Sequence, residues 1–143
     1  MSLMVRVLVL DDREDYLRAL TGALRAEFEI VTAKTIAEAE QSLDPTVQVA
    51  LVDVRLSEED ETNHEGLTFL RWAKAKSPTT PVLMMSAYRD FDAVVDALNL
   101  GADYFFSKPI NLRELRSWLR EFAEHGVMPE RTAELKQRLE RER

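Results

Sequence analysis

The apolar run at residues 47–53 constrains the fold of this chain more than any other segment, because it ends abruptly in a carboxylate. A continuous apolar run with many β-branched residues indicates a strand in the middle of a parallel sheet, where both faces are covered. Asp53 then lies at the carboxyl end of that strand, which is where ligands bind in open α/β sheets. The run therefore predicts a fold class and the place of a site.

Segments with strand and helix character alternate along the rest of the chain. Thr35 with Glu38 and Asn111 with Glu114 have the form of helix N-terminal caps, and Gly101 is placed as a C-terminal cap. Alternation with short connections predicts a parallel sheet with right-handed crossovers and helices on both faces. The expected strands span residues 4–10, 28–33, 47–53, 82–86 and 103–107, and the expected helices span residues 13–27, 36–43, 67–76, 90–100 and 112–122.

The composition suits one α/β domain and argues against several classes of function. A length of 143 residues and a hydrophobic fraction of 45% suit a single core, and the absence of cysteine excludes disulfides and thiolate metal sites. The net charge of -7 argues against direct nucleic acid binding by this segment. Because no run has the length of a membrane span or the order of a signal peptide, we expect no membrane association and a cytoplasmic location.

Polar residues stand at the ends of four expected strands. Asp11 and Asp12 follow the first strand, Asp53 ends the third, Ser86 ends the fourth and Lys108 follows the fifth. Because the carboxyl ends of parallel strands share one rim, we expect these side chains to meet there.

Such a group of residues suits phosphoryl chemistry. Crowded carboxylates repel one another unless a cation lies among them, and a site without His or Cys suits Mg²⁺, with Mn²⁺ as an alternative. A carboxylate beside the metal can attack a phosphoryl group, while the metal and an ammonium neutralise the phosphoryl oxygens. Asp53 is the candidate nucleophile, Lys108 the ammonium, and Ser86 a hydroxyl donor.

In combination, these motifs resemble the receiver domain of two-component response regulators, and the resemblance runs from about residue 5 to residue 122. Asp11-Asp12 resembles the metal-binding acids of the family, and residues 51–53 resemble its phosphoacceptor strand. Ser86-Ala87 is similar to its Thr/Ser-Ala switch, and residues 101–103 are similar to its Gly-Ala before the fifth strand. Lys108-Pro109 resembles its lysine with a cis-prolyl bond.

The resemblance implies a flavodoxin-like receiver fold. That fold is a three-layer (βα)5 sandwich around a five-stranded parallel sheet in the order 2-1-3-4-5. It divides the chain into a receiver domain at residues 4–126 and a charged segment at residues 127–143, which is a linker helix, a dimerising coil or a free tail, with Leu135 and Leu139 as its apolar points.

The resemblance also implies roles for individual residues. Asp12, Asp53 and the backbone carbonyl of Arg55 correspond to the metal ligands, and Asp11 acts largely through the waters of the metal. Ser86 and Phe105 correspond to the switch residues. Phosphorylation then alters the face made by the fourth helix, fifth strand and fifth helix, which is also the candidate homodimer face.

The implied partner is a sensor histidine kinase or a histidine phosphotransfer protein, and the domain is expected to catalyse only its own phosphorylation and slow dephosphorylation.

Two features depart from the family pattern. The acidic loop at residues 57–65 is longer by about five residues than connections of this kind, which indicates a solvated loop or a partner-discriminating one. Phe105 stands where tyrosine is common. Arg55 and Tyr88 are expected to flank the site and to tune the phosphoryl lifetime.

Other interpretations stay open on the residues alone. An Asp-Asp pair after a strand is often only a helix cap, and Phe105 also fits simple packing. A haloacid-type phosphatase needs a second Asp where this chain has Arg55, and a flavodoxin-like cofactor binder needs a phosphate-cradling loop where Asp11-Asp12 would repel phosphate. A receiver that acts as an interaction module without phosphorylation is a third alternative.

Overall fold

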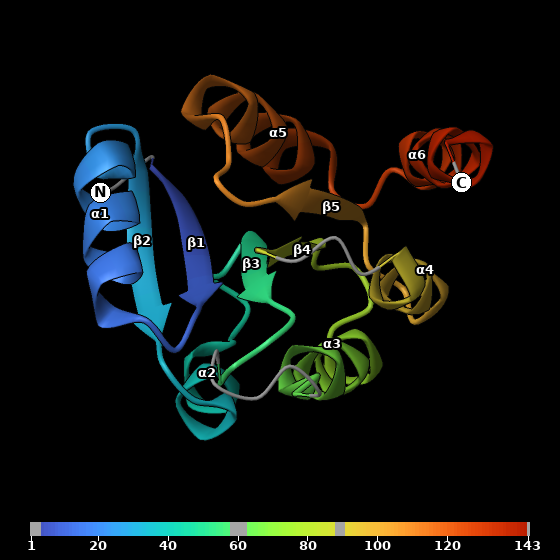
Figure 1. Cartoon of the computed structure of the whole chain (residues 1–143). Helices are drawn as coiled ribbons and strands as arrows, with labels where there is room; N and C mark the ends of the chain where they lie inside the picture. The colour runs from blue at the N-terminus through green and yellow to red at the C-terminus, as the bar shows by residue number, and fades with distance from the viewer. Residues whose placement is uncertain (1–3, 58–62, 88–90, 143) are drawn as a thin grey trace.

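The computed structural model describes residues 4–57, 63–87 and 91–142, and the elements below are those of this part of the chain. Figure 1 shows a central sheet with α1 and α5 on one face and α2, α3 and α4 on the other. The strands are β1 (Val5–Leu10), β2 (Phe28–Ala33), β3 (Val49–Asp53), β4 (Val82–Ser86) and β5 (Tyr104–Ser107). The helices are α1 (Glu14–Leu24), α2 (Ile36–Ser42), α3 (Glu65–Lys76), α4 (Phe91–Asn99), α5 (Leu112–His125) and α6 (Pro129–Arg141).

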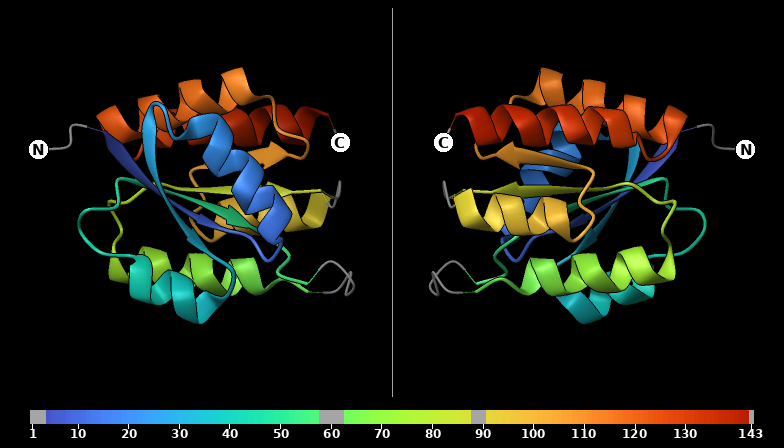
Figure 2. Two further views of the ribbon diagram at one scale, coloured as in Figure 1. Left: turned by 90° about the vertical axis from the view of Figure 1, so that its left-hand side faces the viewer. Right: turned by 90° about the vertical axis from the view of Figure 1, so that its right-hand side faces the viewer.

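The sheet has the order β2-β1-β3-β4-β5, and every neighbouring pair of strands is parallel. This confirms the expected (βα)5 sandwich and its strand order. All five residues of β3 are buried, as the apolar run predicts for a strand at the centre of the sheet. Figure 2 shows the carboxyl ends of the strands directed to one side of the molecule, which we call the rim.

Local sequence signals explain where several helices begin and end. The Thr35 hydroxyl accepts a hydrogen bond from the backbone amide of Glu38 at 3.1 Å, and the Asn111 side chain accepts one from the amide of Glu114 at 3.0 Å, so both expected caps are confirmed. Gly101 follows α4 with φ of 106°, a conformation that glycine adopts without steric cost. The positions of these helix ends are therefore determined by residues within a few positions of them in the sequence.

The helical spacing of Leu112, Leu115, Leu119 and Phe122 predicts a single inward stripe for α5, and that prediction is wrong at Leu112. Leu115, Leu119 and Phe122 are buried, but Leu112 is 37% exposed. Leu112 is the first residue of the helix, directly after the Asn111 cap. Helical spacing places it in register with the buried residues, but at this end of the helix the core does not cover it.

The C-terminal segment forms α6, which Figure 1 places beside the edge strand β5, between α5 and α4. The Leu135 side chain is buried in the main core at 5% exposure, so α6 is packed on the domain and does not extend freely from it. The Thr132 hydroxyl donates to the carbonyl of Asp103 at 2.6 Å, and Lys136 donates to the side chain of Asn99 at 2.9 Å. α6 thus covers the flank of β5, whose outer edge pairs with no other strand among the described residues, and many proteins protect a sheet edge in this way.

A partly buried ion pair fixes the end of the sheet opposite the rim. The Asp103 carboxylate accepts hydrogen bonds from the Lys74 ammonium and from the amide of Val82, both at 2.8 Å. The pair ties α3 to the starts of β4 and β5.

None of the described helices combines the length and the apolar character that a membrane span needs.

Candidate acidic site at the rim of the sheet

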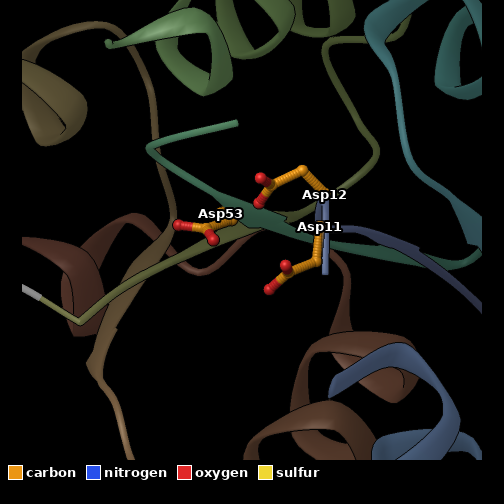
Figure 3. Close-up of side chains that lie close together, drawn as sticks. All are labelled: Asp11, Asp12 and Asp53. Carbon is orange, nitrogen blue, oxygen red and sulfur yellow. The ribbon is translucent and has the colours of Figure 1, made fainter. Parts of the chain in front are cut away.

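Three aspartates meet at the rim because two adjacent strands end there. Asp11 and Asp12 directly follow β1, and Asp53 is the last residue of the neighbouring β3. One carboxylate oxygen from each of the three residues lies within 4.8 Å of the others. Figure 3 shows the three carboxylates grouped around the strand ends. The parallel topology therefore gathers the expected acids.

Lys108 connects two of these acids. Its ammonium lies 2.6 Å from an oxygen of Asp11 and 3.0 Å from an oxygen of Asp53, and its side chain is only 9% exposed. The backbone amide of Lys108 donates to the carbonyl of Ser86 at 2.9 Å, which holds the start of the loop after β5 against the end of β4. The peptide bond to Pro109 is cis, as the resemblance implied.

The electrostatics of the site follow from this burial. Burial raises the pKa of Asp53 to about 7, the positive charge of Lys108 lowers it, and the negative charge of Asp11 adds to the increase. Burial lowers the pKa of Lys108, but Asp53 and Asp11 outweigh that effect and hold it above its ordinary value. Lys108 is therefore a stable cation, whereas burial holds the pKa of Asp53 above that of an exposed aspartate.

The acids fit a hard divalent cation. The group offers three carboxylates, which are the oxygen ligands that Mg²⁺ prefers, with no histidine or cysteine among them. Asp11 and Asp53 are buried and Asp12 is half-buried, so the cluster is partly open to solvent on the Asp12 side. The donor set therefore suits a metal site of the kind that the resemblance implies.

Arg55 lies in the turn that leaves Asp53. Its backbone amide donates to a carboxylate oxygen of Asp53 at 3.2 Å, and the residue is 5% exposed. The chain therefore bends back around the carboxylate directly after β3. The assignment of the Arg55 carbonyl as a metal ligand stays a prediction.

Ser86 and Phe105 lie on the two strands beyond β3. Asp53 is in register with Met85, so Ser86 is the next residue along the neighbouring strand, and it is buried at the rim. Phe105 is half-buried, with its side chain on the opposite face of β5 from Tyr104 and Phe106.

The three rings of Tyr104, Phe106 and Trp118 lie together, with the centroid of Tyr104 5.1 Å from that of Phe106 and 4.3 Å from that of Trp118. Phe105 is on the other face of the sheet from this aromatic group and packs against the core there. The switch roles of Ser86 and Phe105 stay predictions. The expectations for Tyr88 and for most of the acidic loop, residues 58–62, fall outside the described residues.

Two residues of the site were not predicted as such. The ring of Tyr16 lies over Lys108, with the ammonium nitrogen 4.2 Å from the ring centroid. Gly66 approaches the end of β3 so closely that an added Cβ would lie 1.9 Å from the carbonyl oxygen of Asp53. The helical spacing of Tyr16 with Leu17 and Leu20 predicts only a place on the apolar face of α1. Its place in the first turn after the Asp11-Asp12 pair was the available signal.

Comparison with known proteins agrees with this geometry. The profile of the response regulator receiver domain matches residues 7–120. The transcriptional regulatory protein ZraR of Escherichia coli K12 is 31% identical over 123 residues, which are 85% of this chain and 27% of that protein. The chain therefore spans about a quarter of the curated relatives it matches.

Solved structures show the same fold. A response regulator receiver domain protein (CheY-like) from Methanospirillum hungatei JF-1 superposes with a TM-score of 0.75 and 27% identity, over 85% of this chain and 95% of that one. The beryllofluoride-activated receiver domain dimer of NtrC4 superposes with a TM-score of 0.73 and 29% identity, over 84% and 97%.

Proposed function

The chain belongs to the response regulator receiver domain family, and on that premise we propose that Asp53 accepts a phosphoryl group from a phosphohistidine. The observation that carries the proposal is the position of Asp53 at the end of the central strand, 3.0 Å from Lys108 and within the cluster formed with Asp11 and Asp12. Receiver domains are in general not enzymes, and we assign this chain only its own phosphorylation and slow dephosphorylation.

In the proposed transfer, a carboxylate oxygen of Asp53 forms a bond to phosphorus. The bond between phosphorus and the histidine nitrogen breaks, and its electron pair returns to the imidazole of the partner. Lys108 and the Ser86 hydroxyl then hold oxygens of the new acyl phosphate, because ammonium and hydroxyl groups stabilise the charge on a transferred phosphoryl group.

Mg²⁺, when bound, supplies positive charge that favours the ionised form of Asp53 and neutralises phosphoryl oxygens. We propose Asp12, Asp53 and the Arg55 carbonyl as its protein ligands, with Asp11 acting through water. Mn²⁺ is the alternative ion, since it shares the preference for carboxylate oxygens.

We further propose that the response passes to the face made by α4, β5 and α5. A movement of Ser86 toward the phosphoryl group makes room for Phe105, which shifts the balance between two packings of this face. α6 lies across the β5 flank of the face, with Leu135 buried there. A second copy of the chain, or another partner, therefore reaches the β5 flank only when α6 moves.

The partner that the family implies is a two-component kinase. We propose a sensor histidine kinase or a histidine phosphotransfer protein as the donor, a cytoplasmic location, and a homodimer through the same face. The receiver domain dimer of NtrC4 formed with beryllofluoride supports the last point, as a related domain that dimerises in its activated form.

The test is phosphorylation by acetyl phosphate with Mg²⁺, followed by intact mass. We expect the protein to gain one phosphoryl group and the Asp53→Asn variant to gain none. Asp44→Asn is the matched control, because it makes the same change at an exposed aspartate. Uptake of a phosphoryl group by Asp53→Asn, or no uptake by the unaltered protein, would overturn the proposal.

A further inference from the structure

We propose that Tyr16 is a positioning residue of this site, whose ring holds the Lys108 ammonium in place between Asp11 and Asp53. The inference rests on the proposed function, because it assigns Tyr16 a part in how Lys108 meets a phosphoryl group. It concerns a contact between α1 and the loop after β5, which are far apart along the chain.

The backbone brings the ring to the rim. Tyr16 is in the first turn of α1, shortly after β1 has delivered Asp11 and Asp12. Side chains in a helix lean toward its N-terminus, which here is the end of α1 nearest the acids. The residue is half-buried and packs against the main core, so the ring has a fixed support behind it.

The contact has the geometry of a cation-π interaction. The Lys108 nitrogen lies 4.2 Å from the centroid of the Tyr16 ring, well inside the range of about 6 Å over which such contacts are attractive. The Lys108 side chain is 9% exposed. Little water competes for the ammonium, and desolvated contacts of this kind are the stronger ones.

Three groups therefore surround the ammonium. Carboxylate oxygens of Asp11 and Asp53 accept its hydrogen bonds at 2.6 Å and 3.0 Å, and the face of the ring covers a further side. A lysine stem has four flexible carbons, so an ammonium without such a support samples many positions. The ring limits that sampling and pre-orders the charge where the phosphoryl oxygens arrive.

The phenol keeps its neutral form in this setting. Burial raises the pKa of Tyr16, Lys108 lowers it, and Asp11 and Asp53 add to the increase, with the net result above the ordinary value. Tyr16 therefore presents an uncharged aromatic face to Lys108 instead of forming an ion pair with it.

Two substitutions distinguish a role of the aromatic face of Tyr16 from a role of its hydroxyl and from simple packing. Tyr16→Phe keeps the aromatic face and removes the hydroxyl, whereas Tyr16→Leu keeps an apolar side chain in the core and removes the aromatic face. A positioning role of the ring predicts that Phe is tolerated and Leu is not. A role of the hydroxyl predicts that both lose affinity, and simple packing predicts that Tyr16→Leu loses thermal stability with no change in beryllofluoride affinity.

The contact itself is tested in the metal-free protein by NMR of the lysine side chains, with Lys108 assigned through Lys108→Arg. We expect the ring current of Tyr16 to displace the methylene resonances next to the Lys108 nitrogen. The displacement should persist in Tyr16→Phe and vanish in Tyr16→Leu. Because this readout needs neither metal nor phosphoryl group, it tests the contact even if Asp53 is not a phosphoacceptor. A resonance that stays the same in Tyr16→Leu would overturn the inference.

The effect of the Tyr16 contact on the affinity for a phosphoryl analogue is tested by titration with beryllofluoride in the presence of Mg²⁺, monitored by tryptophan fluorescence or NMR. We expect the Kd of Tyr16→Leu to rise by about three- to tenfold, in line with a desolvated cation-π contact, and that of Tyr16→Phe to stay within about twofold. Thermal unfolding identifies any loss of fold. If Tyr16→Leu proves unfolded, Tyr16→Met, whose unbranched side chain fills irregular space more readily and also lacks an aromatic face, takes its place. Equal Kd values for all folded variants, or an equal loss in Tyr16→Phe, would overturn the inference.

Discussion

Lys108 and Asp53 form a buried ion pair across 55 positions of the sequence, with the ammonium nitrogen 3.0 Å from a carboxylate oxygen. The pair joins the phosphoacceptor candidate to the residue that would hold its phosphoryl group. One ammonium is shared by two buried acids, since Lys108 also contacts Asp11 at 2.6 Å. The resting site therefore carries excess negative charge, and its stability depends on pH and on added cations.

Replacing Asp53 with asparagine should change how stability depends on pH. The folded pKa of Asp53 is about 7, above the value of about 3.9 expected when unfolded. The native state holds the proton more tightly between these values, so the free energy of unfolding falls as pH rises from about 4 to about 7. In urea titrations without metal, we expect Asp53→Asn to gain roughly 1 to 4 kcal/mol relative to the unaltered protein between pH 4 and pH 8. An identical pH slope in the two proteins would contradict the assigned pKa.

Removing the Lys108 charge should destabilise the metal-free protein. Lys108→Met leaves Asp11 and Asp53 buried without their cation, which costs about 3 to 5 kcal/mol for a buried pair. Adding Mg²⁺ should recover part of the loss. Lys74→Met is the control, because it breaks a second, partly buried ion pair, with Asp103, away from the rim. Chemical denaturation with and without Mg²⁺ measures both variants, and recovery of Lys74→Met by Mg²⁺ would show that the effect is not specific to the site.

Gly66 should tolerate no larger residue. A Cβ at this position would lie 1.9 Å from the backbone oxygen of Asp53, so Gly66→Ala must push the start of α3 away from the end of β3. We expect a loss of about 2 to 4 kcal/mol of stability and weaker beryllofluoride binding. Gly22→Ala is the matched control, because no atom lies within 4 Å of the added Cβ in the interior of α1. It should stabilise the protein by about 0.5 to 1 kcal/mol. A neutral Gly66→Ala would contradict the packing described.

Releasing α6 should expose the flank of β5. Leu135→Glu places a charge at a position that is 5% exposed, so we expect α6 to detach while the sheet stays folded. Hydrogen exchange should accelerate across residues 129–141, and light scattering should show more self-association, since an uncovered edge strand pairs readily. Leu112→Glu is the control, because Leu112 is already 37% exposed. Unchanged exchange in α6 would mean that Leu135 does not anchor the helix.

Short-range patterns in the sequence determined the elements and the general place of the site. Side-chain periodicity and the caps at Thr35 and Asn111 act within a few residues, so they can be read without knowing the fold. The rule that parallel strands share a rim was enough to group Asp11, Asp53 and Lys108, because it needs only the order of strands and helices.

Tertiary structure decided which side chains meet once the helices are placed on the sheet. Leu112 and Leu135 have the same chemistry, yet only Leu135 is buried, because α6 packs beside β5 whereas Leu112 is at the exposed first position of α5. The same holds for Tyr16, whose ring covers Lys108 only because α1 and the end of β5 come together at the rim. Such contacts depend on how elements far apart in sequence are positioned in space, and periodicity carries no information about that position.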